Sequence, residues 1–169
     1  MTQVARSLVA WDTRAVPSDH TLAKISNSLG ATGLRWAGKL NVPLYRVSGG
    51  RIGGKVGRAP VLLLTTTGRK SGQQRTSPIV YLQDDENVVV INTNAGNAKI
   101  PAWSLNLKAN PQGEVEVGRK RYPVRARIAE GEERERLWRE HNEQYAGFDD
   151  YQEKLDRQAS VIVLEPASS

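Results

Sequence analysis

The sequence predicts an α+β fold that is mainly β, in which six antiparallel strands form a barrel with helices packed around it. Three observations lead to this fold class. Short apolar or alternating runs recur along the chain and are bounded by Gly, Pro, Asn and Asp. Compact polar turns separate neighbouring runs, and few stretches have helical periodicity. Six strands with short connections favour an antiparallel barrel over a doubly wound sheet.

The strands are expected at residues 61–66, 75–82, 88–93, 114–117, 121–128 and 159–164. Polar residues at 84–87 and a glycine at position 118 close two hairpins. Pro78 lies within the second strand, which predicts an edge, a bulge, or a place where a ligand meets the backbone. In the fifth strand the apolar residues Tyr122, Val124, Ala126 and Ile128 alternate with Pro and Arg. The face of the strand that carries these four residues is expected to be buried, and the other face to be exposed to solvent.

Three helical segments are expected between the strands. The first begins near residue 18 and ends at Pro43, the second covers residues 101–110, and the third covers residues 132–145. His141 lies on the inward face of the third helix and is interpreted as a packing residue, not a catalyst. Helical spacing continues through Tyr145, Phe148 and Tyr151, which places these rings along one side of a helix.

The chain is expected to form one barrel domain with small additions at its ends. Residues 1–42 are expected to form an N-terminal arm and helix, residues 43–166 the barrel, and residues 167–169 a tail. Arg35 and Lys39 flank the apolar stripe of the N-terminal helix. Packing of this stripe on the sheet is the favoured interpretation, and weak contact with a membrane surface is the alternative.

Composition narrows the functional classes. The 169 residues include no cysteine and two histidines, which excludes disulfides and thiolate chemistry and argues against a metal site. The net charge of +6 favours an anionic partner, either a polyanionic cofactor, a membrane surface or nucleic acid. Nucleic acid ranks last because the sequence contains no nucleic-acid-binding module. With no membrane span or secretory signal visible, a cytoplasmic location is expected.

The connection between the first two strands has the composition of an anion cradle. Gly68 and Gly72 let the backbone turn its N–H groups outward, while Arg69, Lys70 and Arg75 supply positive charge. A polar hairpin with solvated cations is the alternative. The stretch is not a P-loop, because it leads into a strand and an arginine interrupts the motif. The glycine-rich, basic residues 48–58 are interpreted either as a loop lining the site or as a linker.

Three separated segments carry the most distinctive residue patterns. They are TTTGRKSGQ from Thr65 with Arg75 and Pro78, the stretch from Gly96 to Pro111 with its PxWxxNLxANP pattern, and YxxFxxY at 145–151. In this order, the chain resembles the deazaflavin-dependent nitroreductase and quinone reductase family of actinobacteria. Members of this family are split β-barrel enzymes, similar to FMN-binding proteins, that use coenzyme F420. The resemblance extends from about residue 43 to residue 166.

The resemblance implies a set of cofactor-binding residues. The phosphate and acidic tail of the deazaflavin would lie on the cradle, and its ring system would lie along the second strand, the turn at 92–94 and the start of the second helix. The residues are Arg69, Lys70, Ser71 and Arg75 for the tail; Thr76, Ser77, Pro78, Ile79, Val80, Asn92, Thr93 and Asn94 along the ring; and Ala102, Trp103, Ser104, Leu105 and Asn106 closing the ring pocket.

The resemblance also implies an activity, namely hydride transfer from reduced F420 to a quinone-like or nitro-aromatic acceptor. Tyr145 and Tyr151, together with Phe148, match the acceptor-pocket residues of the family. A phenylalanine at the middle position departs from the family pattern and disfavours nitro reduction. Residues 157–161 also depart from that pattern.

Two alternatives stay open at this point. One is a related split barrel that binds FMN, which needs only one phosphate site; Arg51, Lys55 and Arg58 favour a longer anionic tail. The other is a non-catalytic F420-binding protein, because the sequence contains no diagnostic acid–base residue. The oligomeric state is not readable from the sequence.

Overall fold

The computed structural model describes residues 42–145 and 147–167. All of them belong to the second of two compact units, which spans residues 35–169. The predicted N-terminal arm and helix lie outside the described residues, apart from residue 42. Within the described part, no helix is both long and apolar enough to cross a membrane.

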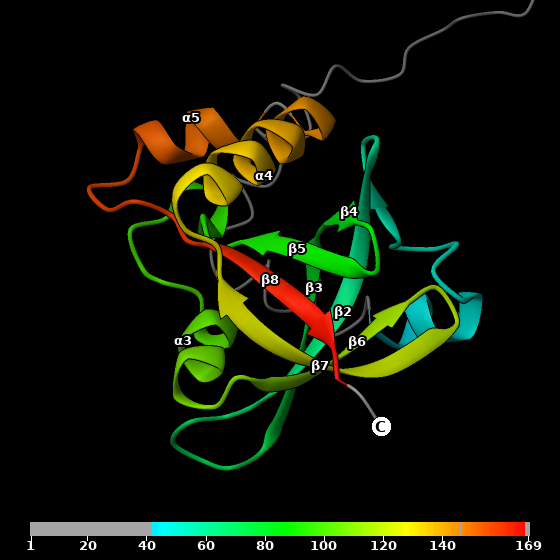
Figure 1. Ribbon diagram of the computed structural model, residues 1–169. Coiled ribbons are helices and arrows are strands. Elements are labelled where there is room, and N and C mark those ends of the chain that lie inside the picture. The colour runs from blue at the N-terminus through cyan, green and yellow to red at the C-terminus, as the bar shows by residue number, and fades with distance from the viewer. Residues whose placement is uncertain (1–41, 146, 168–169) are drawn as a thin grey trace, which may run out of the picture. The chain divides into compact units, whose positions relative to one another are not determined.

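The described residues form eight strands in one antiparallel sheet (Figure 1). They are β1 (Lys55–Val56), β2 (Ala59–Thr67), β3 (Gln74–Val80), β4 (Leu82–Asp84), β5 (Asn87–Ile91), β6 (Gln112–Val117), β7 (Lys120–Ile128) and β8 (Val161–Pro166). The order is β1-β2-β6-β7-β8-β5-β4, and β3 pairs with β2. The mainly β class with flanking helices is confirmed, but the expected strand number of six is wrong.

The extra strands come from a short hairpin and from a change of partner. β1 forms a two-residue hairpin arm against the start of β2. The predicted second strand is divided at Tyr81, because β3 pairs with β2 whereas β4 pairs with β5. The Tyr81 N–H still donates to the Pro60 carbonyl at 3.1 Å, so the change of partner occurs within one residue. This segment therefore runs from the partner of β2 to β4, the strand at one end of the order.

Pro78 lies in β3 opposite Leu63 of β2. Among the described strands, β2 is the only neighbour of β3. The edge position expected from Pro78 is therefore confirmed, and it has a simple cause. Proline has no N–H to donate, so it is tolerated where no second strand needs that donor.

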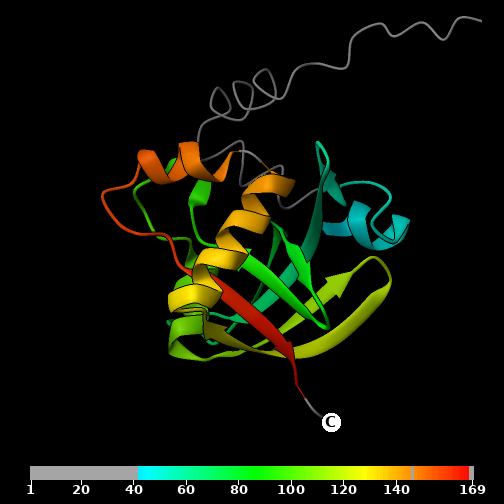
Figure 2. The ribbon, with the colours of Figure 1, turned by 45° about the horizontal axis from the view of Figure 1, so that its top comes forward.

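Both faces of the central strands are buried, which explains their uninterrupted apolar runs. Val88 and Val90 of β5 pack in one cluster with residues of β2, β6, β7 and β8. The intervening Val89 and Ile91 pack in a second cluster under the helices α4 (Gly131–Gln144) and α5 (Phe148–Glu153). Figure 2 shows both helices lying across the same side of the sheet.

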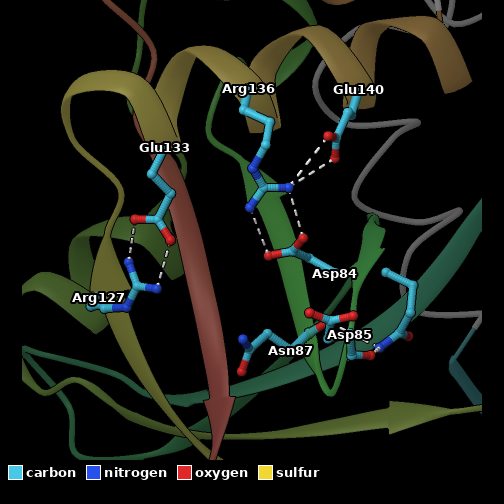
Figure 3. Close-up of polar contacts among 8 residues, drawn as sticks. Asp84, Asp85, Asn87, Arg127, Glu133, Arg136 and Glu140 are labelled. Atoms are coloured by element: carbon cyan, nitrogen blue, oxygen red, sulfur yellow. Dashed lines mark hydrogen bonds and ion pairs between the residues drawn. The ribbon is translucent and has the colours of Figure 1, made fainter.

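Ion pairs at its surface fix α4 against the sheet (Figure 3). Arg136 of α4 bonds both carboxylate oxygens of Asp84, at 2.9 and 3.3 Å, and also contacts Glu140. Arg127 of β7 makes a bidentate pair with Glu133, at 2.6 and 2.8 Å. These side chains are partly exposed, so their geometry orients the helix more than it stabilises the fold.

Three local expectations need correction. Pro43 is not the last residue of a helix, because it lies within a helix over residues 42–48; the helix expected before it lies outside the described residues. Ile128 is 56 % exposed, because it lies beyond the end of the cluster into which Tyr122 and Val124 point. The third helix ends at Gln144 and a separate helix begins at Phe148.

Candidate functional site

The loop between β2 and β3 closes tightly on itself. The Gly68 N–H donates to the Gln73 carbonyl at 2.8 Å, and the Gly72 N–H donates to the Gly68 carbonyl at 2.7 Å. A Cβ atom at Gly68 would lie 2.8 Å from Ser71 Oγ, and Gly72 has a φ of +66°. The positive φ favours glycine at position 72, a side chain at position 68 would crowd Ser71, and the loop has a defined shape.

The cations of this loop are exposed. The ion pairs among described residues do not include Arg69, Lys70 or Arg75. The Arg75 guanidinium is held by a hydrogen bond to Gln73 Oε1 at 2.9 Å. Exposed cations on a glycine-shaped loop suit an anionic ligand. The ligand would not have to displace an acidic side chain of the protein in order to bind them.

A buried amide attaches this loop to the helix α3 (Ala102–Ala109). Asn106 Oδ1 accepts from the backbone N–H of Arg69 at 3.1 Å, and its Nδ2 donates to the Thr66 hydroxyl at 3.1 Å. Arg69 and Asn106, two predicted site residues that are 37 positions apart in sequence, are thereby joined. Ala102 is exposed, Trp103 and Leu105 are partly buried, and Trp103 packs against the first apolar cluster.

A second buried amide, that of Asn92 at the end of β5, attaches α3 to the segment before β8. Asn92 Nδ2 donates to Ser104 Oγ of α3 at 2.9 Å. Its Oδ1 accepts from the Ser160 N–H at 2.7 Å and from the Arg157 guanidinium at 3.2 Å. Sequence reasoning missed Arg157 and Ser160 as parts of this network. Their only sequence signal is that both lie in the segment that departs from the family pattern.

The turn after Asn92 contacts α5. Thr93 is buried, and the 3₁₀ turn η1 (Asn94–Gly96) follows it. Asn94 has a φ of +52°, a conformation that asparagine tolerates better than most residues. A Cβ at Gly96 would lie 3.5 Å from Tyr151 Cδ1, so the turn lies against the aromatic side chains of α5.

The β3 residues predicted to line the ring face two different sides of the sheet. The Thr76 hydroxyl lies 2.8 Å from the Thr65 hydroxyl in a groove of about 580 Å³ on the side that also carries Glu114 and Arg121. Ile79 instead packs against the first apolar cluster. Ser77, Pro78 and Val80 are partly buried. One planar ring system therefore cannot contact all five side chains equally.

Tyr145, Phe148 and Tyr151 form a cluster although no single helix carries them. The ring centroids of Tyr145 and Phe148 are 5.4 Å apart, and those of Phe148 and Tyr151 are 6.3 Å apart. The two tyrosine hydroxyls are 3.1 Å apart. Burial, followed by the hydrogen bond with Tyr145, raises the pKa of Tyr151 well above its usual range. Its hydroxyl therefore keeps its proton at neutral pH.

Phe148 and His141 lie in the core beneath the tyrosines. Phe148 is 5 % exposed, and its ring centroid is 4.5 Å from that of His141. Neither ring nitrogen of the fully buried His141 has a hydrogen-bond partner among the described residues. Burial lowers the pKa of His141 to about 4, so the ring is neutral at pH 7. This position supports the interpretation of His141 as a packing residue.

The structure separates the two basic regions. Figure 1 shows the β2–β3 loop extending past α3, at the end of β2. Arg51, Lys55 and Arg58 instead precede β2, at its other end. Nine strand residues span up to about 30 Å. These three cations therefore lie at the opposite end of β2 from the cradle.

The arrangement of loop, α3 and turn is consistent with the comparisons to known proteins. The family model for F420H(2)-dependent quinone reductase matches residues 36–166. The chain belongs to this family. An F420H(2)-dependent quinone reductase of Mycobacterium tuberculosis is 38% identical over 130 residues, which cover 75% of this chain and 87% of that protein. The resemblance found in the sequence is thereby confirmed.

Solved structures agree with the family assignment. An F420-H2 dependent reductase (FDR-A) shares 39% identity with a TM-score of 0.59, covering 63% of this chain and 94% of its own. A chain described as a domain-swapped dimer shares 34% identity with a TM-score of 0.61, covering 78% and 98%. The heme storage protein HutZ from Vibrio cholerae, at 19% identity and a TM-score of 0.50, shares the fold alone.

We expect the buried His141 to make the stability of this family member depend on pH. Its pKa is lower when folded than the ordinary value of 6.5 in the unfolded chain, so unfolding takes up a proton between these values. The free energy of unfolding should therefore fall as the pH drops from about 6.5 towards 4, by about 1.4 kcal/mol per pH unit.

Urea unfolding of the wild type and His141→Leu across this pH range measures the effect. The carboxylates and the other histidine titrate in both proteins, so the difference between their free energies of unfolding isolates His141. A difference that does not change with pH would contradict the expectation.

We expect two substitutions of Asn106 to differ in their effects. Asn106→Ala leaves the Arg69 N–H and the Thr66 hydroxyl without this partner, and should lower the free energy of unfolding by about 1–3 kcal/mol. Asn106→Asp keeps an acceptor for both groups but adds negative charge at the loop. It should weaken F420 binding about tenfold, equivalent to roughly 1.4 kcal/mol. Urea unfolding and fluorescence titration test these expectations; wild-type stability of Asn106→Ala would exclude a supporting role for the amide.

Proposed function

We propose that this protein transfers a hydride from reduced coenzyme F420 to a quinone. The observation that carries the proposal is the attachment of the cationic β2–β3 loop to α3 through Asn106. This hydrogen bond connects the loop that would bind the anionic groups of the cofactor to the helix that would lie against its planar ring. The family to which the chain belongs uses the same cofactor and acceptor class.

The residues fit the cofactor in charge and shape. We assign the phosphate and acidic tail of F420 to Arg69, Lys70, Ser71 and Arg75, whose exposed side chains lie on the glycine-shaped loop. When bound, reduced F420 supplies a hydride from the central carbon of its deazaflavin ring. We assign the ring to the region between β3, α3 and the turn that begins at Asn92.

The protein's own contribution is to position the reactants. Asn92 and Asn106 hold α3 in a fixed place, which preserves the relation between the loop and the ring region. Such preorganisation lowers the entropic part of the barrier. On the acceptor side, we propose that the hydroxyls of Tyr145 and Tyr151 donate hydrogen bonds to the oxygen on which negative charge develops.

A quinone is the better acceptor for this site than a nitro-aromatic compound. Reduction of a nitro group builds negative charge on its oxygens and gains from several donors. A quinone can accept a hydride while solvent completes its protonation. Phe148 offers no hydroxyl and is buried under the tyrosines, so it adds no donor at this place. We therefore propose that quinone reduction is faster than nitroimidazole reduction.

Titration with F420 and with FMN tests the cofactor assignment. We expect tighter binding of F420, because its tail adds negative charges that reach the cations of the loop. Higher salt should weaken this binding, since exposed charges are screened over about 8–10 Å at physiological ionic strength. Turnover of reduced F420 with menadione then separates an enzyme from a cofactor carrier. Equal or tighter binding of FMN at low and high salt would refute the cofactor assignment.

We expect Lys70→Ala and Arg75→Ala to lose F420 affinity without loss of the fold. Each removes a charge-assisted hydrogen bond of roughly 1.5–3 kcal/mol, which corresponds to about ten- to a hundredfold in dissociation constant. Arg139→Ala is the matched control, because Arg139 is an exposed cation on α4. Fluorescence titration and a thermal melt of each variant measure affinity and folding. A double variant with wild-type affinity would identify the loop as a solvated hairpin.

We expect Tyr145→Phe and Tyr151→Phe to lower kcat for menadione while leaving F420 affinity unchanged. Losing one hydrogen bond to developing charge costs about 1.5 kcal/mol, or roughly tenfold in rate. Tyr122→Phe is the control, because Tyr122 is a partly buried tyrosine of β7 outside this pair. Wild-type kcat in both variants would exclude the hydroxyl pair from the reaction.

A further inference from the structure

A surface that the proposed function does not use combines exposed apolar side chains with cations. We call it the basic-apolar surface. It comprises Leu44, Val47, Ile52 and Val56, which are all exposed, and the exposed cations Arg51, Lys55, Arg58, Arg119 and Lys120. Val47 is 84 % exposed and Ile52 is 55 % exposed. All four apolar residues lie within residues 42–58, and exposed apolar residues that recur within one segment indicate an interaction site more strongly than scattered ones do.

The buried Tyr45 orients the helix that carries two of these residues. Its hydroxyl accepts from the Gly118 N–H at 2.9 Å and lies 3.1 Å from the Val61 carbonyl, to which it can donate. Leu44 and Val47 are three residues apart, so they share the side of the helix that Tyr45 does not occupy. Their exposure thus follows from a fixed helix position.

The following turns hold Ile52 and Val56 in defined places. The Ile52 N–H donates to the Ser48 hydroxyl at 2.9 Å, which closes the turn after the helix. The Val61 N–H donates to the Gly54 carbonyl at 2.9 Å, which attaches the turn to β2. Val56 pairs with Ala59 across a two-residue hairpin turn. Ile52 and Val56 therefore lie on backbone that hydrogen bonds hold in place.

The β6–β7 turn adds two cations to this surface. A Cβ at Gly49 would lie 2.9 Å from Arg119 Cγ, and one at Gly50 would lie 3.2 Å from Gly118 Cα. Arg119 and Lys120 therefore adjoin the turn after the helix. Figures 1 and 2 both show the helix over residues 42–48 beside this hairpin turn, at the opposite end of the sheet from α3.

The charge of the chain is strongly uneven. Residues 42–83 contain seven Lys and Arg and no Asp or Glu, whereas residues 84–167 contain twelve Lys and Arg and sixteen Asp and Glu. Three of the seven cations belong to the cradle, and three of the others, Arg51, Lys55 and Arg58, alternate with apolar residues on the basic-apolar surface. An anionic partner that also accepts apolar side chains matches this composition.

We propose that the basic-apolar surface docks on an anionic lipid bilayer. Cations near such a surface attract acidic headgroups, while short apolar side chains on turns enter the boundary between headgroups and acyl chains. Leu44 and Val47 lie on one helix, Ile52 on the turn after it and Val56 in β1. The exposed apolar side chains are thus spread over several short elements, a distribution that suits insertion into a fluid layer better than the continuous face of a protein interface. The proposal does not depend on the bound cofactor or on the acceptor.

The absence of cysteine from the sequence gives a direct test. Ile52→Cys in the full-length chain provides a single site for an environment-sensitive dye. Ile128→Cys is the matched control, because Ile128 is an equally exposed isoleucine on β7, outside the basic-apolar surface. With vesicles of phosphatidylcholine and phosphatidylglycerol, we expect a blue shift of dye emission at position 52 and none at position 128. Equal shifts at both positions, or no shift at position 52, would overturn the proposal.

Vesicle sedimentation with unlabelled full-length variants separates this surface from the rest of the chain. We expect Lys55→Glu/Arg58→Glu to reduce binding to anionic vesicles about tenfold or more, because each cation near the membrane contributes about 1 kcal/mol. Ile52→Ser/Val56→Ser should also reduce binding while leaving menadione turnover in solution unchanged. The control Ile128→Ser/Arg139→Glu should bind as the wild type does.

Each further outcome decides the proposal. Wild-type binding by both surface variants would overturn it and would assign any membrane contact to another part of the chain, such as residues 1–41. Equal binding to pure phosphatidylcholine and to anionic vesicles would also overturn it. Loss of menadione turnover in the wild type would refute the proposed function but not the docking surface, because vesicle binding is measured without cofactor.

Discussion

The side-chain amide of Asn106 is the interaction on which the geometry of the site depends. It bonds the backbone of the β2–β3 loop with its oxygen and the Thr66 hydroxyl of β2 with its nitrogen. Both halves of the amide are satisfied, so burying it costs little. Any displacement of α3 would leave two buried polar groups without partners. The loop and the helix must therefore keep one relative position.

Asn92 makes the same kind of bond at the other end of the site. Together, the two amides hold α3 to the β2–β3 loop and to the segment before β8. Apolar packing alone, here through Leu107 and Trp103, would tolerate small shifts of a short helix. Hydrogen bonds are directional, so they do not tolerate such shifts of the helix. The candidate site is thus held together by polar contacts, whereas the sheet beneath it is held together by apolar ones.

The sequence predicted those parts of the fold that depend on neighbouring residues. Alternation and turn composition located the strands, and Pro78 indicated the edge of the sheet. The change of partner at Tyr81 was not predictable, because it depends on which strand lies alongside. The partners of Asn92 and Asn106 were hidden for the same reason, since they lie 12 to 68 residues away in sequence. The sequence pattern around a polar residue does not indicate which residue, far away in the chain, will be its hydrogen-bond partner.

The open edge of β3 has a consequence for how the protein behaves at high concentration. A strand with one neighbour exposes backbone donors and acceptors that a second copy of the chain could pair with, which is a common route to aggregation. Pro78 removes one donor from the middle of that edge, and Arg75 places a charge near its start. The strand can thus remain accessible to a small planar molecule while resisting extension of the sheet by another protein molecule.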